Sequence, residues 1–194
     1  SSFDSIRRFA QLYQSRYDEL NVLICNAGVL VPERKLSVDG HELTFATNHL
    51  GHFLLTHLML PCLRKAGGGA SGSNNSSQNN EDNVDNGIAA NDGAHGSHAS
   101  SSSTTTAEKP SSRTRSPFGP SRIIVISSVM HTTGSLSNVV NDPNVTTRAY
   151  SSVGSTEYAD SKLANLLFAY ELNRRLRARS DPINVYAVHP GTMA

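Results

Sequence analysis

The sequence predicts an α/β fold in which helices wind over both faces of a parallel sheet. Segments with apolar residues at steps of three and four alternate along the chain with short, continuous apolar runs. The first pattern is typical of an amphipathic helix and the second of a buried strand. Because strands and helices alternate, we expect right-handed crossovers between parallel strands, with ligands bound at the carboxyl ends of the strands.

The amino-terminal part of the chain predicts one strand between two helices. Residues 21–25 are a short apolar run, which predicts a parallel strand buried on both faces. Residues 42–63 have the apolar period of a long helix that stops near Pro61. Ser2 is a candidate N-cap for a first helix over residues 3–17. The apolar stripe of that helix consists of Phe3, Ile6, Phe9, Ala10, Tyr13 and Tyr17.

The carboxy-terminal part repeats the alternation. Residues 122–127 predict a second buried strand, residues 157–179 a second long helix and residues 183–188 a third strand. The side chains that we expect to face inward from the long helix are Leu163, Leu166, Leu167, Tyr170 and Leu176.

Residues 66–117 are crowded with Gly, Ser, Asn and Thr, and the whole chain is only 37% hydrophobic. Such a segment is too polar to form a core. We therefore expect one domain, made of residues 1–65 and 118–194, that is interrupted by a disordered low-complexity insertion at 66–117.

Composition and charge argue against several classes of protein. A formal net charge of +1 without a long basic block argues against nucleic-acid binding. Cys25 and Cys62 are isolated, so they indicate neither a disulfide framework nor a metal site, and a reducing compartment is expected. No apolar run approaches the roughly 18 to 20 residues of a membrane span, and we expect no signal peptide. We expect an intracellular protein, either cytoplasmic or associated with a membrane if an anchor precedes Ser1.

Three polar segments follow the predicted strands at their carboxyl ends: Asn26-Ala27-Gly28, Ser127-Ser128 and His189-Pro190-Gly191-Thr192. Tyr158 and Lys162 lie four residues apart on a predicted helix, so their side chains leave the same face. An ammonium group one helical turn away stabilises a phenolate, which allows a tyrosine to act as a base near neutral pH. Taken alone, Tyr158 and Lys162 could be an ordinary pair on a helix surface. Ser127-Ser128 could simply end a strand and cap a turn.

Histidines are the remaining candidates for metal chemistry. His49, His52 and His57 lie on one predicted helix, but no cysteine or carboxylate joins them at ligand spacing. We therefore expect histidines that pack against the core, and no metal site.

Taken in order, the motifs resemble those of the short-chain dehydrogenase/reductase family. They are Asn26-Ala27-Gly28, Asn48-His49-Leu50-Gly51, Ser127-Ser128, Tyr158-Ala159-Asp160-Ser161-Lys162 and Pro190-Gly191. The longer strings at residues 48–56, 161–168 and 189–192 look like the retinol dehydrogenase and WW-domain oxidoreductase branch. The resemblance implies a Rossmann-like sheet that carries cofactor and substrate in one domain.

The resemblance also implies a catalytic set of Asn48, Ser128, Tyr158 and Lys162. Tyr158 would move the hydroxyl proton of the substrate, and Ser128 would hydrogen-bond the substrate oxygen, with Ser127 the weaker candidate. Lys162 would also hold the ribose of the cofactor. Asn48 would interrupt its helix and hold a water that links Lys162 to solvent.

The implied cofactor is NAD or NADP. The residues expected to line it are Asn26, Ala27 and Gly28 on the adenosine side, Pro190, Gly191 and Thr192 on the nicotinamide side, and the pair Tyr158 and Lys162. The implied reaction is reversible hydride transfer between the cofactor and a hydrophobic alcohol or carbonyl compound, such as a retinoid or a steroid. Relatives also lead us to expect a homodimer through the helices at 42–63 and 157–179.

The Gly-rich turn that binds the pyrophosphate in this family has no counterpart in the sequence. We expect two to three further strand–helix units, or about 60 to 90 residues, before Ser1, and another loop and strand after Gly191. The alternative reading is a truncated, catalytically inactive fragment that acts at most through partners. A third hypothesis makes the insertion at 66–117 an interaction segment on a catalytic body.

Overall fold

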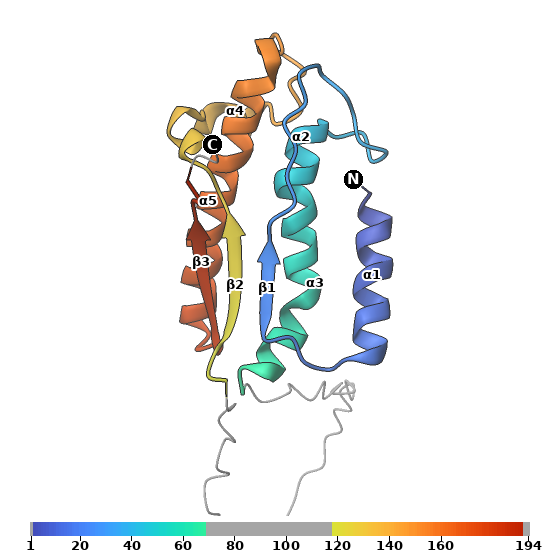
Figure 1. Cartoon of the computed structure of the whole chain (residues 1–194), viewed down its shortest axis with the longest axis vertical. Coiled ribbons are helices and arrows are strands. Elements are labelled where there is room, and N and C mark those ends of the chain that lie inside the picture. Colours follow the sequence, from blue (N-terminus) through green and yellow to red (C-terminus); the bar gives the residue numbers. More distant parts are fainter. Residues whose placement is uncertain (1, 69–117, 192–194) are drawn as a thin grey trace, which may run out of the picture. The chain divides into compact units, whose positions relative to one another are not determined.

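A computed structural model describes residues 2–68 and 118–191. These residues form a three-stranded parallel sheet in the order β1-β2-β3, with helices packed on it (Figure 1). The strands are β1 (Val22–Cys25), β2 (Ser121–Ile126) and β3 (Ile183–Val188). The register pairs Leu23 with Ile123 and Ile123 with Val185. The predicted α/β fold with a parallel sheet is confirmed.

One helix precedes β1, and the others occupy the connections between the strands. They are α1 (Phe3–Arg16), α2 (Leu43–Phe45), a π-helical turn (Ala46–Leu50), α3 (Gly51–Ala66), a 3-10 turn (Val129–Thr133), α4 (Leu136–Asn141), a second 3-10 turn (Ser152–Gly154) and α5 (Ser155–Ala178). Ser2 caps α1 as predicted, since its Oγ accepts a hydrogen bond from the backbone N–H of Ser5 at 3.3 Å. Within residues 2–68 and 118–191, none of these helices is both long and apolar enough to span a bilayer.

The core lies between α1, α3 and α5 and one face of the sheet. The buried residues of that core include Ala10, Leu23, Cys25, Met59, Leu63, Ile123, Val125, Ala169, Leu176 and Ile183. Successive strand residues point to opposite faces, and Val22 and Ile24 of β1 remain exposed, Ile24 to 57%. The prediction that residues 21–25 are buried on both faces is therefore wrong, because the three helices pack on the same face.

The inner face of α5 differs from its predicted apolar stripe. Leu176 is buried as predicted, but Leu167 and Tyr170 are exposed, Tyr170 to 65%. Small and polar residues take their place in the half of α5 nearest the carboxyl ends of the strands, including Ala159, Ser161, Lys162, Ala164 and Asn165. Two of them reach the strand directly, because Lys162 Nζ and Asn165 Nδ2 both donate to the carbonyl of Ile126 at 3.2 Å.

Helix α3 continues past Pro61 to Ala66, so the prediction that it stops near Pro61 is wrong. A proline inside a helix removes one backbone hydrogen bond and crowds the preceding turn. Here Met59, Cys62, Leu63 and Ala66 are buried on both sides of it, so tertiary packing outweighs that cost. Ala66 thus ends a helix instead of opening the insertion, and the predicted disordered segment lies outside the described residues from position 69 onward.

Candidate active site

Tyr158 and Lys162 meet at the carboxyl end of β2, in the first half of α5. Lys162 is only 3% exposed, and its Nζ donates to the carbonyl of Ile126, the last residue of β2. The same Nζ lies 5.3 Å from the centroid of the Tyr158 ring. Burial lowers the pKa of the Lys162 ammonium. The structure thus brings together the pair that its four-residue spacing predicted, with a cation beside the phenol ring.

The loop after β1 passes close to this pair. A Cβ added to Gly28 would lie 3.4 Å from Asn48 Oδ1 and 3.5 Å from Lys162 Nζ. Asn26 and Ala27 precede it in the same loop and are exposed. At this point Gly28 therefore presents backbone and no side chain beside Asn48 and Lys162.

Asn48 is fully buried in the π-helical turn, so the predicted interruption of its helix is present. Its Oδ1 accepts from the N–H of Val29 at 2.7 Å, and its Nδ2 donates to the carbonyl of Val29 at 2.9 Å and to Ser161 Oγ at 3.0 Å. The side chain therefore fastens the loop after β1 to α5. Its role in a proton relay stays a prediction.

The two serines after β2 have different surroundings. Ser127 is buried, and its Oγ donates to the carbonyl of Lys162 at 2.8 Å, which joins β2 to α5. Ser128 is half-buried and caps the following 3-10 turn, since its Oγ accepts from the N–H of Met130 at 3.3 Å. Of the two hydroxyl groups, that of Ser128 is therefore the more accessible.

Pro190 and Gly191 follow β3 at the same edge of the sheet and are exposed. Gly191 has a φ of +94°, a value that favours glycine, and its N–H donates to His189 Nδ1 at 3.3 Å. Thr192, the remaining predicted residue of this segment, lies outside the described residues.

His52 is buried, and His49 is half-buried. His49 Nδ1 contacts Asn165 Oδ1 at 3.1 Å, and His52 Nδ1 contacts the carbonyl of Asn48 at 2.9 Å. Burial lowers the pKa of both imidazoles, and the charge of Lys162 lowers that of His52 further. Among the described residues, no group of three His, Cys, Asp or Glu side chains could hold a metal ion.

These two histidines give the stability of the chain a pH dependence. Their pKa values in the folded state lie below the unfolded value of about 6.5, so the unfolded state binds protons first as the pH falls. Stability is therefore present above about pH 6.5 and declines below it. Urea unfolding between about pH 5 and 8 should show this decline. The decline in unfolding free energy should be weaker in a His49→Gln, His52→Gln double variant. It should be unchanged in a variant of the exposed His57, His57→Gln. If the parent chain and both variants lost stability equally with falling pH, the assignment to His49 and His52 would be wrong.

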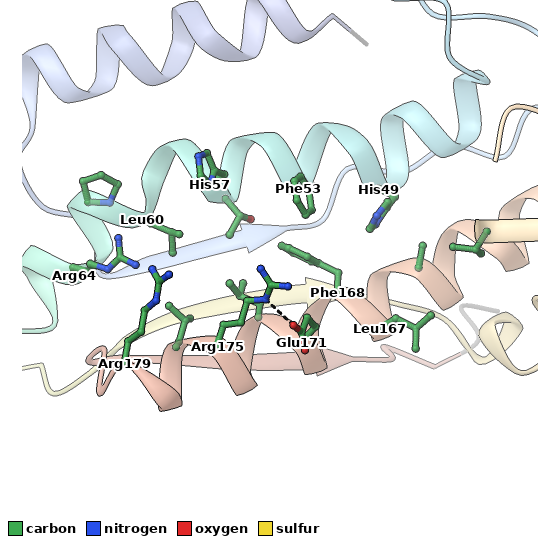
Figure 2. A pocket seen from close by; sticks show the side chains of 16 residues that line it. His49, Phe53, His57, Leu60, Arg64, Leu167, Phe168, Glu171, Arg175 and Arg179 are labelled. Carbon is green, nitrogen blue, oxygen red and sulfur yellow. Dashed lines mark hydrogen bonds and ion pairs between the residues drawn. The ribbon is translucent and has the colours of Figure 1, made fainter. Parts of the chain in front are cut away.

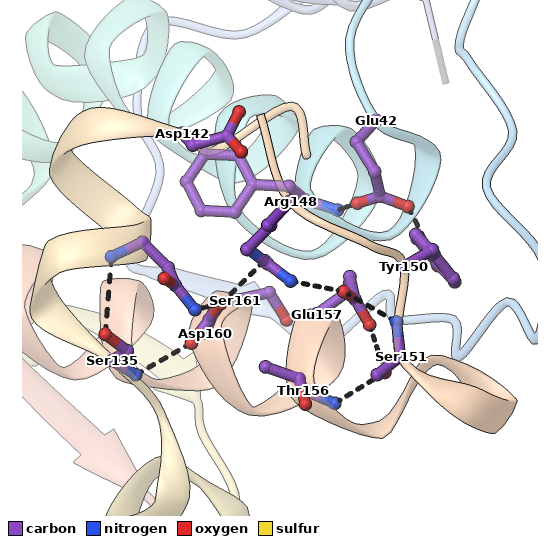
Figure 3. A network of polar contacts seen from close by, with 12 residues as sticks. Glu42, Ser135, Asp142, Arg148, Tyr150, Ser151, Thr156, Glu157, Asp160 and Ser161 are labelled. Atoms are coloured by element: carbon purple, nitrogen blue, oxygen red, sulfur yellow. Dashed lines mark hydrogen bonds and ion pairs between the residues drawn. The ribbon is translucent and has the colours of Figure 1, made fainter. Parts of the chain in front are cut away.

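Sequence reasoning missed a network of buried carboxylates around the first turns of α5 (Figure 3). Glu42, Glu157 and Asp160 are all buried, and Arg148 forms ion pairs with the last two. The one available signal was the position of Asp160 inside the Tyr158-to-Lys162 motif. Its partners lie at the start of α4, within α4 and in the loop that follows it, and no periodic pattern links them to Asp160.

A groove of about 680 Å³ lies between α3 and α5. Its apolar lining includes Phe53, Leu167 and Phe168, and Glu171 pairs with Arg175 at its edge, as Figure 2 shows. None of the predicted catalytic or cofactor-binding residues lines it. Self-association through these two helices stays a prediction.

Comparison with known proteins agrees with this arrangement. Residues 1–84 match the family model described as short chain dehydrogenase. The polyprenol dehydrogenase of Danio rerio is 36% identical over 192 residues, which are 98% of this chain and 43% of that protein. Retinol dehydrogenase 11 of Homo sapiens is 31% identical over 193 residues, which are 100% of this chain and 42% of that protein.

Solved structures show the same fold. An uncharacterised protein from Mycobacterium paratuberculosis aligns with a TM-score of 0.62 and 31% identity, over 98% of this chain and 47% of that chain. NADPH-bound carbonyl reductase from chicken fatty liver, at 20% identity, aligns with a TM-score of 0.51 over 100% of this chain and 58% of that chain, and supports the fold alone. The chain spans less than half the length of the curated relatives named above. With these motifs, this sheet and these relatives, the chain belongs to the short-chain dehydrogenase/reductase family, in its retinol dehydrogenase-like branch.

Proposed function

We propose that the protein is an NAD(P)-dependent oxidoreductase that interconverts an alcohol and its carbonyl compound. The observation that carries this proposal is the buried ammonium of Lys162, held at the end of β2 and 5.3 Å from the ring centroid of Tyr158. Burying a cation beside a phenol ring destabilises the fold, because desolvation disfavours the charge. The same pair is useful as an acid–base device.

The residues around Lys162 fit a nicotinamide cofactor. An ammonium group has three N–H donors, so besides its bond to Ile126 it can donate to ribose hydroxyls. The backbone at Gly28 passes close enough for an added Cβ to contact Lys162 Nζ, and a loop without side-chain bulk lets a ligand approach the backbone. Asn26, Ala27 and Gly28 would hold the adenosine side, and Pro190, Gly191 and Thr192 the nicotinamide side. When bound, NAD or NADP accepts or supplies the hydride.

The residues of the chain would manage the proton and the substrate oxygen. Tyr158 takes the hydroxyl proton of the alcohol or returns it to the carbonyl oxygen, and the charge of Lys162 stabilises the phenolate form. Ser128 donates a hydrogen bond to the oxygen while its charge changes. Asn48 keeps the loop after β1 in place through Val29 and would hold the relay water.

The surroundings of Tyr158 favour a hydrophobic substrate. Exposed apolar side chains follow β1 and β2 at the edge of the sheet where Tyr158 lies, namely Val29, Leu30, Val129 and Leu136. Apolar linings with a few polar groups are usual in sites for apolar ligands. Together with relatives named for retinol and polyprenol, this supports a retinoid- or steroid-like alcohol or carbonyl compound.

Binding and turnover by the chain itself test the proposal. We expect the fluorescence of reduced NAD or NADP to change on titration, and turnover of retinol, a polyprenol or a hydroxysteroid to follow. Lys162→Met should weaken cofactor binding at least about tenfold, which is the effect of losing about 1.4 kcal/mol. Lys65→Met is the matched control, because Lys65 pairs with Asp18 on the surface. If the chain neither binds a cofactor nor turns over a substrate, the alternative of a catalytically inactive fragment would hold instead.

A further inference from the structure

Two buried carboxylates flank Tyr158 on α5. The side chains of Glu157 and Asp160 are 1% and 5% exposed. Buried charges are destabilising unless they are paired and hydrogen-bonded. Arg148 supplies the pairing, since its Nη1 lies 2.6 Å from Glu157 Oε1 and its Nη2 lies 3.1 Å from Asp160 Oδ2. Figure 3 shows the guanidinium group reaching both carboxylates.

Asp160 also holds the segment that follows β2. Its Oδ1 accepts from the N–H of Ser135 at 2.7 Å, and its Oδ2 accepts from Asn138 Nδ2 at 2.9 Å. Ser135 is the N-cap of α4 and lies seven positions after Ser128 in the sequence. The carboxylate two residues after Tyr158 therefore fixes the end of the turn that Ser128 begins.

Close packing makes this segment sensitive to displacement. A Cβ added to Gly134 would lie 2.7 Å from the carbonyl oxygen of Ala159 and 2.9 Å from Leu163 Cβ. The turn between Ser128 and Gly134 therefore lies directly against the backbone of α5, on the turn that carries Tyr158. A small shift of Asp160 therefore displaces the turn between Ser128 and Gly134, because closely packed atoms cannot absorb it.

Glu157 fixes the other neighbouring segment. It accepts from the N–H of Ser151 at 3.2 Å and from Ser151 Oγ, and the same Oγ accepts from the N–H of Thr156 at 3.1 Å. Arg148 precedes Ser151 by three positions, so one short segment binds both carboxylates and caps the first turn of α5. The network therefore joins three parts of the chain around Tyr158.

We propose that Asp160 and Arg148 are positioning residues that set the distance between Ser128 and Tyr158. They would act without touching the substrate, through the Ser135 contact and the paired carboxylates. The inference rests on the proposed function and extends it, because proton transfer and oxyanion stabilisation require both hydroxyl groups in one geometry. Misplacement by about 1 Å can cost about 100-fold in rate.

The test compares two matched aspartates. Asp160→Asn removes the charge that Arg148, Ser135 and Asn138 share. Asp181→Asn removes a similar partner, since Asp181 is 14% exposed in its side chain and pairs with Arg64 through two bonds of 3.0 Å. Asp181 lies just before β3, at the end of the sheet away from Tyr158, so it controls for the loss of a bidentate, partly buried ion pair.

We expect Asp160→Asn to lower kcat about 10- to 100-fold, with a KM for the cofactor that changes less than about twofold. Amide exchange should become faster over residues 129–138 in Asp160→Asn and not in Asp181→Asn. Arg148→Lys, which keeps the charge, should retain a higher kcat than Arg148→Met. Asp181→Asn should lower thermal stability and leave kcat unchanged. A kcat that is unaffected by Asp160→Asn, or that falls equally in Asp181→Asn, would overturn the inference.

The exchange measurement separates this inference from the proposed function. If the parent chain turns over no substrate, the proposed function fails. Faster exchange over 129–138 in Asp160→Asn, and not in Asp181→Asn, would still support the positioning network. Unchanged exchange in Asp160→Asn would refute it, whatever the activity of the parent chain.

Discussion

Replacing Gly154 with alanine is expected to destabilise the chain by about 2 to 5 kcal/mol. Gly154 has a φ of +68°, where a residue with a Cβ is strained by about 1 to 2 kcal/mol. The added Cβ would also lie 2.0 Å from the carbonyl oxygen of Val31, and overpacking of this kind costs about 1 to 3 kcal/mol. Urea unfolding of the variant and the parent chain measures the difference.

Gly40→Ala is the matched control for Gly154→Ala. Gly40 has a φ of +79° but nothing within 4 Å of an added Cβ, so only the backbone strain of about 1 to 2 kcal/mol applies. Equal losses in the two variants would show that the contact with Val31 carries no cost. The contact is relevant to function, because Tyr150 Oη also donates to the carbonyl of Val31, at 2.9 Å. A displaced Val31 would shift the loop that holds Gly28, so cofactor binding should weaken along with stability.

Tyr158→Phe is expected to lower turnover by about 100- to 10,000-fold, the usual contribution of a general acid–base group. Phenylalanine keeps the ring that lies 5.3 Å from Lys162 Nζ and removes only the hydroxyl. Cofactor affinity should therefore change little, and the loss should fall on kcat. Steady-state kinetics with a fluorescence titration of the reduced cofactor separate the two quantities.

Tyr13→Phe is the control for the loss of a tyrosine hydroxyl. Tyr13 lies on α1, and its hydroxyl donates to the carbonyl of Glu19 at 2.9 Å, so its removal affects local stability without reaching Tyr158. If Tyr158→Phe kept turnover within about tenfold of the parent, another group would have to move the proton.

Several elements follow from the sequence because one local pattern specifies them. Residues 183–188 form β3 with the predicted bounds, since a short apolar run between a helix and a turn allows few alternatives. The approach of Tyr158 to Lys162 follows from helix geometry alone. The π-helical turn at Asn48 was expected only through the family resemblance, because no composition signal distinguishes it from the α-helix around it.

Other features depend on tertiary packing that a linear pattern does not encode. The apolar sequence of residues 21–25 does not show that α1, α3 and α5 pack on one face of the sheet. The exposure of Ile24 could therefore not be predicted. Pro61 predicted the end of a helix, but the burial of Leu63 just after it outweighs the backbone hydrogen bond that the proline removes. The network around Asp160 joins residues 9 to 25 positions apart through loops, and loop contacts carry no periodicity.

The contact between His52 and the carbonyl of Asn48 has a spectroscopic consequence. A carbonyl oxygen only accepts hydrogen bonds, so at 2.9 Å the imidazole must carry its proton on Nδ1. Its neutral form is thereby fixed in one tautomer, which the ¹⁵N chemical shifts of the ring distinguish from the other. A single labelled histidine thus reports on the integrity of the π-helical turn, and any ligand that rearranges Asn48 becomes visible without an assay of turnover.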